Sequence, residues 1–74
     1  MTTRTHVQTE RRVPTNVNEW NTLLTLSIRK AEALQDSRLP GLRKAMVEGK
    51  AEPFLRRMGI ISQVDIAREF PDAG

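Results

Sequence analysis

Few side chains in this sequence could carry out chemistry. His6 is the only histidine and there is no cysteine, so neither a thiolate nucleophile nor a histidine pair for a metal ion is available. Glu48 and Glu52 could serve as an acid and a base, but they flank Lys50 in a segment that we expect to be a solvated turn. The glycines are isolated and form no phosphate-binding loop. We therefore expect a protein that is not an enzyme and that holds no metal ion or cofactor.

Basic residues are the clearest chemical signal. The chain has 12 lysine and arginine residues against 9 acidic ones, for a net charge of +3, and the excess lies in an N-terminal arm and in residues 37–59. The candidates for contact with nucleic acid are Arg4, Arg11, Arg12, Arg43, Lys44, Arg56 and Arg57. They could also form an ordinary solvated surface, in which long basic side chains cover the apolar edges of short helices. Convergence of the last four on one face would favour nucleic acid, and dispersal would favour a protein partner.

The segment SQVDIAREF, residues 62–70, resembles the first helix of the helix-turn-helix family, in which an Ile-Ala pair packs against a second helix that enters the major groove. That family usually has a glycine where Pro71 stands, and only PDAG follows the segment here. We therefore expect this helix to brace the core rather than to read DNA. The side chains expected to be buried are Ile61, Val64, Ala67 and Phe70, and exposure of Ile66, Ala67 and Phe70 would contradict the role.

Periodicity and helix-end signals predict an all-α fold. We expect one long amphipathic helix and three short ones, at about 16–36, 40–48, 53–58 and 62–70. Asn16 and Glu19 can form a capping box at the start of the long helix. The apolar stripe of that helix comprises Val17, Trp20, Leu23, Leu24, Ser27, Ile28, Ala31 and Leu34.

Three apolar residues of the long helix are candidates for contact with a protein partner: Trp20, Leu26 and Ala33. Trp20 lies on the apolar stripe, so it can be either an anchor of the core or, if exposed, a strong contact residue. Leu26 and Ala33 lie seven residues apart on an otherwise polar flank. A following helix or a second molecule could cover that flank.

A single small domain is predicted for residues 14–74, after a basic arm at residues 1–13 that is flexible or pairs with a partner. A chain of this size buries only about 60% of the surface that its unfolded form exposes. Without cysteines there is no disulfide to add stability, so we expect a homo-oligomer. No apolar run approaches the roughly 20 residues that span a bilayer, and the N-terminus lacks the apolar centre of a secretory signal. We expect a cytoplasmic protein that makes no membrane contact.

These features favour a small non-enzymatic helical protein that binds and modulates a larger protein. It would be an adaptor, inhibitor or regulatory subunit of the kind that phages, plasmids and bacteria use. The alternative is a small dimeric DNA-binding transcriptional regulator that uses the basic arm and residues 37–59. With one tryptophan, two phenylalanines and no tyrosine, a surface for stacking single-stranded nucleic acid is not expected.

Overall fold

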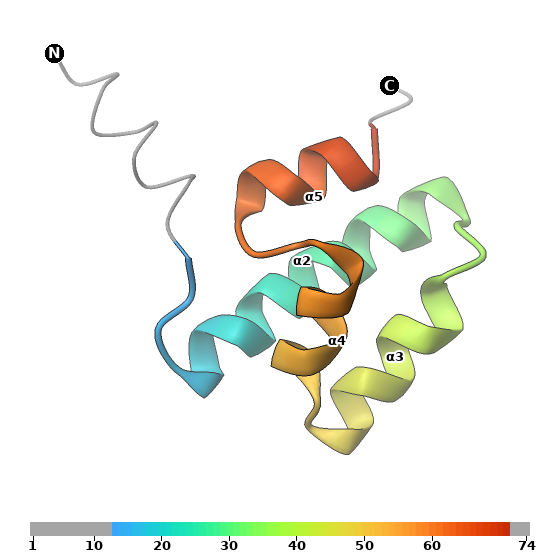
Figure 1. Ribbon diagram of the computed structural model, residues 1–74. Coiled ribbons are helices and arrows are strands. Elements are labelled where there is room, and N and C mark those ends of the chain that lie inside the picture. Colours follow the sequence, from blue (N-terminus) through green and yellow to red (C-terminus); the bar gives the residue numbers. More distant parts are fainter. Residues whose placement is uncertain (1–12, 72–74) are drawn as a thin grey trace, which may run out of the picture.

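The computed structural model describes residues 13–71, and within this range the chain forms helices joined by short turns, with no strand. The helices are α2 (Val17–Leu34), α3 (Leu39–Glu48), α4 (Ala51–Met58) and α5 (Gln63–Glu69). One long helix followed by three short ones is the predicted all-α fold (Figure 1). Residues 1–12 of the predicted arm lie outside the described residues.

Helix α2 is the element against which the others pack. It contacts α3, α4 and α5, and α3 also contacts α4. Figure 1 shows α5 and α3 lying along different parts of α2, with α4 between them. No helix in the described part of the chain is both long and apolar enough to cross a bilayer.

The start of α2 is set by side-chain hydrogen bonds. Asn16 Oδ1 accepts from the backbone N–H of Glu19 at 2.9 Å. The Glu19 carboxylate reaches back and accepts from the Thr15 N–H at 2.9 Å and from the Thr15 hydroxyl at 3.2 Å. The predicted cap at Asn16 is therefore confirmed, with the glutamate bonded one residue before the cap. Such a cap contributes about 1 kcal/mol to helix stability.

The buried face of α2 is the centre of the predicted stripe. Trp20, Leu23, Leu24, Ser27 and Ala31 are buried, and Ile28 and Leu34 are partly buried against the core. The Ser27 hydroxyl donates to the Leu23 carbonyl at 3.0 Å, which satisfies this buried polar group. Val17 was predicted to be buried and is wrong: it is the first residue of the helix, 71% exposed, at the edge of a hollow.

Glycines end α3 and α4, as their positions suggested. Gly49 and Gly59 have φ values of 70° and 84°, which an L side chain rarely adopts. After each glycine the chain bonds back to the helix: Lys50 N–H to the Ala45 carbonyl and Ile60 N–H to the Leu55 carbonyl, both at 2.9 Å. This tight turn carries Ile60 directly into the core, where it is fully buried.

Of the residues predicted to be buried on α5, Phe70 is confirmed, and the rest of the predicted side is wrong in register. Ile60, Ser62, Ile66 and Phe70 are buried, whereas Ile61 and Ala67 are exposed and Val64 is partly buried. The reason is the turn at Gly59: because it places Ile60 inside, the residues at 62, 66 and 70 follow on the same face. Helix α5 nevertheless packs against the core as expected, because Ile66 and Phe70 are buried. Ser62 is its N-cap residue and makes no side-chain cap bond. Asp65 in the first turn accepts from the Ile61 N–H at 2.9 Å, which holds the chain that enters the helix.

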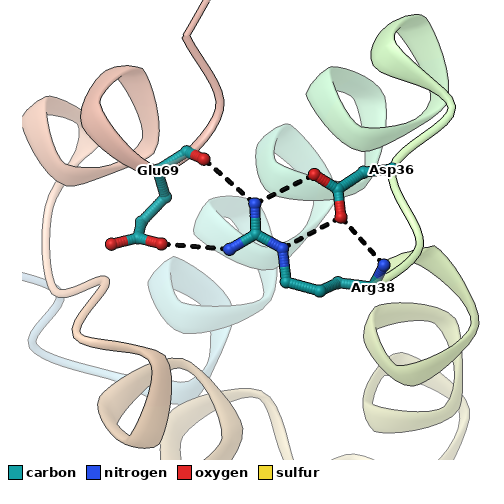
Figure 2. A network of polar contacts seen from close by, with 3 residues as sticks. All are labelled: Asp36, Arg38 and Glu69. Atoms are coloured by element: carbon teal, nitrogen blue, oxygen red, sulfur yellow. Dashed lines mark hydrogen bonds and ion pairs between the residues drawn. The ribbon is translucent and has the colours of Figure 1, made fainter.

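The end of α5 is fastened to the turn between α2 and α3 by Arg38 (Figure 2). Arg38 donates to both carboxylate oxygens of Asp36 at 2.9 Å, and to the carboxylate and backbone carbonyl of Glu69 at 3.0 Å. The guanidinium also lies 4.4 Å from the centre of the Phe70 ring. Arg38 thus connects the turn after α2 to the last residues of α5, next to the buried Phe70.

Candidate functional site

Helices α2 and α5 form the more apolar of the two larger hollows described here. The hollow has a volume of about 360 Å³ and is lined by Leu26, Arg29, Lys30, Gln63, Ile66 and Ala67. We call it the α2/α5 groove. Leu26, Ile66 and Ala67 provide its apolar surface, and the first of these is the residue that the sequence singled out on the flank of α2. Leu26 is only partly buried, and Ala67 opposite it on α5 is exposed.

The other two predicted contact residues have different positions. Trp20 is 4% exposed and lies in the core, so it is unavailable as a surface contact. Trp20 is therefore an anchor of the core, which is one of the two roles considered for it. The Arg56 guanidinium lies over its ring, 5.0 Å from the ring centre. Ala33 is exposed but does not line the groove. It lies on the same side of α2 as Leu26, about 10 Å further along the helix axis.

The four basic residues of α3 and α4 that were predicted to contact nucleic acid are divided between two environments. Arg43 pairs with Glu32 of α2 at 2.9 Å, and Arg56 pairs with Glu52 at 2.9 Å. Both are thereby engaged by carboxylates of the chain itself. Lys44 and Arg57, by contrast, line a common hollow. The four do not converge on one unpaired surface, and Arg4, Arg11 and Arg12 lie outside the described residues.

The hollow that contains Lys44 and Arg57 lies between α3 and α4 and has a volume of about 260 Å³. Its other lining residues are Gly41, Ala45, Glu48, Lys50, Pro53 and Phe54. The Phe54 ring packs close to Gly41, since a Cβ at that position would lie 3.3 Å from the ring. We call this the α3/α4 hollow. Lys50 is a cation of the hollow that the sequence analysis did not single out, and it pairs with Glu48 only at 3.9 Å.

The strongest electrostatic perturbation lies in the Arg38 network. Hydrogen bonds from the Arg38 side chain, and then from its backbone N–H, lower the pKa of Asp36 from 3.8 to about 2. The bond to Asp36 in turn raises the pKa of Arg38, with a smaller contribution from Glu69. Because these groups bond to one another and to the end of α5, the perturbation reflects a structural ion-pair network.

Chemistry at a metal ion gains no support from the described residues. Within residues 13–71 there is no group of three or more His, Cys, Asp or Glu side chains placed to hold a metal ion. His6 lies outside this range. The arrangement offers two kinds of surface: an apolar groove with basic residues beside it, and a basic hollow with an aromatic ring in its wall.

The fold defines the chain as a small all-α protein of four helices in its described part. A scan against models of protein families, a search of curated proteins and a search of solved structures found no match. The function is therefore inferred from the geometry of the two surfaces.

The residues Arg29, Lys30 and Gln63 of the α2/α5 groove were not identified from the sequence. For Arg29 and Lys30 the available signal was their position. They follow Leu26 by three and four residues, which places them one helical turn further along the same flank. Gln63 could not be assigned to the groove without knowing the register of α5.

Proposed function

We propose that this chain is a small non-enzymatic helical protein that binds and modulates a larger protein, and that the α2/α5 groove is the contact surface. The observation that supports this most directly is the incomplete cover over Leu26. An apolar side chain that a neighbouring helix only partly shields, next to the exposed Ala67, forms a concave apolar surface.

The division of the basic residues also supports a protein partner. Nucleic-acid binders gain affinity by neutralising many phosphates with free cations. Here Arg43 and Arg56 are paired within the chain, which leaves fewer cations for phosphates than the sequence suggests. A groove that combines apolar contact area with a few charges at its edge suits recognition of a protein surface.

The proposal is tested with variants that fill or charge the groove. Ala67→Arg introduces a long side chain at an exposed position and should leave the core intact, whereas Leu26→Asp places a charge in the groove wall. Partners captured from a host lysate are identified and purified, and their affinities for each variant are measured directly. Each variant should weaken binding about 30-fold or more, as expected for the loss of a central contact of about 2 kcal/mol.

Val47→Asp is the matched control for these variants. Val47 is an apolar residue of α3 that is 86% exposed and lines neither hollow, so a new charge there should leave binding unchanged. Circular dichroism establishes that every variant is folded. If Ala67→Arg and Leu26→Asp both retain full affinity while folded, the groove is not the contact surface.

A second candidate function is binding of duplex DNA through the α3/α4 hollow. The observation that favours it is the convergence of Lys44, Lys50 and Arg57 on one hollow. Binding to random duplex DNA is measured over a salt series with two double variants. Lys44→Ala with Arg57→Ala should reduce the magnitude of the slope of log K against log salt by about 1.8 for two lost phosphate contacts, and Arg43→Ala with Arg56→Ala should change it less. No binding at low salt would exclude this function.

The proposal includes a homo-oligomeric state and a cytoplasmic location, both of which stay predictions. Light scattering coupled to size-exclusion chromatography determines the first, and fractionation of the host cell determines the second. A dimer that persists in the Leu26→Asp variant would place the self-contact away from the α2/α5 groove.

A further inference from the structure

The carboxylates in the described part of the chain are all engaged. Each of the seven accepts a hydrogen bond or an ion pair from another group of the chain: Glu19, Glu32, Asp36, Glu48, Glu52, Asp65 and Glu69. They cap helix ends, pair with cations of the same helix, or connect two elements.

The cations are distributed differently. Of the nine lysine and arginine residues between positions 13 and 71, five form ion pairs within the chain: Arg38, Arg43, Lys50, Arg56 and Arg68. Among the described residues, the four without such a pair are Arg29, Lys30, Lys44 and Arg57. The first two line the α2/α5 groove, next to Leu26. The groove thus combines an apolar surface with two positive charges that no carboxylate among residues 13–71 neutralises.

We propose that the α2/α5 groove binds an acidic amphipathic helix of another protein, an inference that rests on the proposed function. Apolar side chains on one face of that helix contact Leu26 and Ala67, and carboxylates beside them pair with Arg29 and Lys30. A helix is the fitting element because the groove has helical walls and the described residues contain no strand edge to which an extended peptide could add.

The spacing on α2 predicts a pattern in the partner. Arg29 and Lys30 lie three and four residues after Leu26, a distance of about 5 Å along the helix axis. A partner helix that runs alongside α2 therefore needs carboxylates three or four residues from its central apolar residue. The two charges give specificity for an acidic helix, and the apolar contact provides most of the binding energy.

The described part of a second copy of this chain is a poor occupant of the groove. Its described carboxylates would have to leave their present partners before they could pair with Arg29 and Lys30. Such an exchange breaks one ion pair for each that it forms, so it provides no net electrostatic gain. Among the described residues, the charge balance therefore favours a partner with free carboxylates.

The probe that tests this is a displayed library of 18-residue helices with three leucines on one face. Positions three and four residues from the central leucine are varied among Glu, Gln and Lys, and the library is selected against the full chain. We expect Glu to be enriched over Lys at these positions, with about tenfold tighter binding for the purified helices, as two partly exposed ion pairs would provide. Glu enrichment at these positions that is lost with Leu26→Asp supports the inference.

Charge exchange provides the sharper control. With Arg29→Glu and Lys30→Glu the selection should enrich Lys instead of Glu, and with Arg29→Gln and Lys30→Gln the preference should disappear while binding remains. Val47→Asp should leave the selection unchanged.

The outcomes separate the two proposals. If no helix binds in a manner that depends on Leu26, the proposed function through this groove fails. If helices bind through Leu26 but show no preference for Glu, the groove is a protein-binding surface and the acidic partner is refuted. Self-association of the full chain that Leu26→Asp abolishes would likewise overturn the acidic partner, because a second copy would then occupy the groove.

Discussion

The register of α5 can be tested by comparing two adjacent positions. Ile66 is 4% exposed and packs in the core, whereas Ala67 is exposed at the edge of the groove. Truncation of a buried isoleucine to alanine costs about 2–5 kcal/mol, and the lower part of this range applies to Ile66 because the groove beside it lets the site relax. We therefore expect Ile66→Ala to destabilise the fold by about 2–3 kcal/mol. We expect about 0.5 kcal/mol or less for Ala67→Asp, which alters only an exposed position.

The loss expected for Ile66→Ala is a large part of the stability of a chain of this size. A domain of 74 residues has an unfolding free energy of roughly 4–11 kcal/mol. The loss at Ile66 should lower the melting temperature by about 10–20 °C. Urea unfolding followed by circular dichroism and by the fluorescence of Trp20, the only tryptophan, measures the change directly.

The opposite order of effects would refute the register. If Ala67→Asp unfolded the protein while Ile66→Ala were tolerated, the buried side of α5 would be the one expected from the sequence pattern. The groove between Leu26 and Ala67 would then not exist in the form described here.

Three further predictions concern the elements that hold the helices in place. Because the pKa of Asp36 is lowered to about 2, this carboxylate contributes stability that is fully present above its ordinary pKa and is lost as the pH falls through about 2. The difference in unfolding free energy between the wild type and Arg38→Gln should therefore shrink between pH 4 and pH 2, and a difference that stays constant would contradict the network. Gly59→Ala should destabilise by about 1–2 kcal/mol, since Gly59 has a φ of 84°, whereas an effect near zero by urea unfolding would argue against that turn. Asn16→Ala should cost about 1 kcal/mol and lower the helix content at the start of α2, which amide hydrogen exchange of Glu19 reports; unchanged protection there would rule out the cap.

The helices themselves could be predicted from the sequence because their signals are local. Asn16 is close in sequence to the helix that it caps, and the stripe from Trp20 to Ala31 repeats with the period of a helix. Gly49 and Gly59 mark the ends of α3 and α4 through their own backbone conformation. Each of these features depends on residues within a few positions of one another.

The register of α5 could not be predicted in the same way. Around a helix of seven residues, two apolar sets compete, and both include Phe70: the predicted set adds Ile61, Val64 and Ala67, and the observed set adds Ile60 and Ile66. The choice between them is made by the turn at Gly59, which places Ile60 in the core. That choice depends on how α4 and α5 pack, and the local pattern contains no information about it.

The pairing of the cations was hidden for a similar reason. Arg43 binds a carboxylate 11 residues away, and Arg38 binds one 31 residues away. Adjacent basic residues such as Arg43 and Lys44 look alike in the sequence, yet the structure pairs only the first. For this reason the sequence analysis grouped four cations as one candidate surface and did not identify Arg29 and Lys30. Leu26 was identified because its position on the flank of α2 follows from the local sequence. Its neighbours on α5 depend on how the two helices pack, so they were not identified.

The most direct test of the α2/α5 groove is a nuclear magnetic resonance titration of the isotope-labelled chain with the tightest Glu-flanked helix from the selection. Our account predicts that the backbone amide shifts change around residues 26–33 of α2 and 63–67 of α5, and that those around Lys44, Lys50 and Arg57 stay in place. Shifts concentrated in the α3/α4 hollow, with Leu26 and Ala67 unaffected, would contradict it.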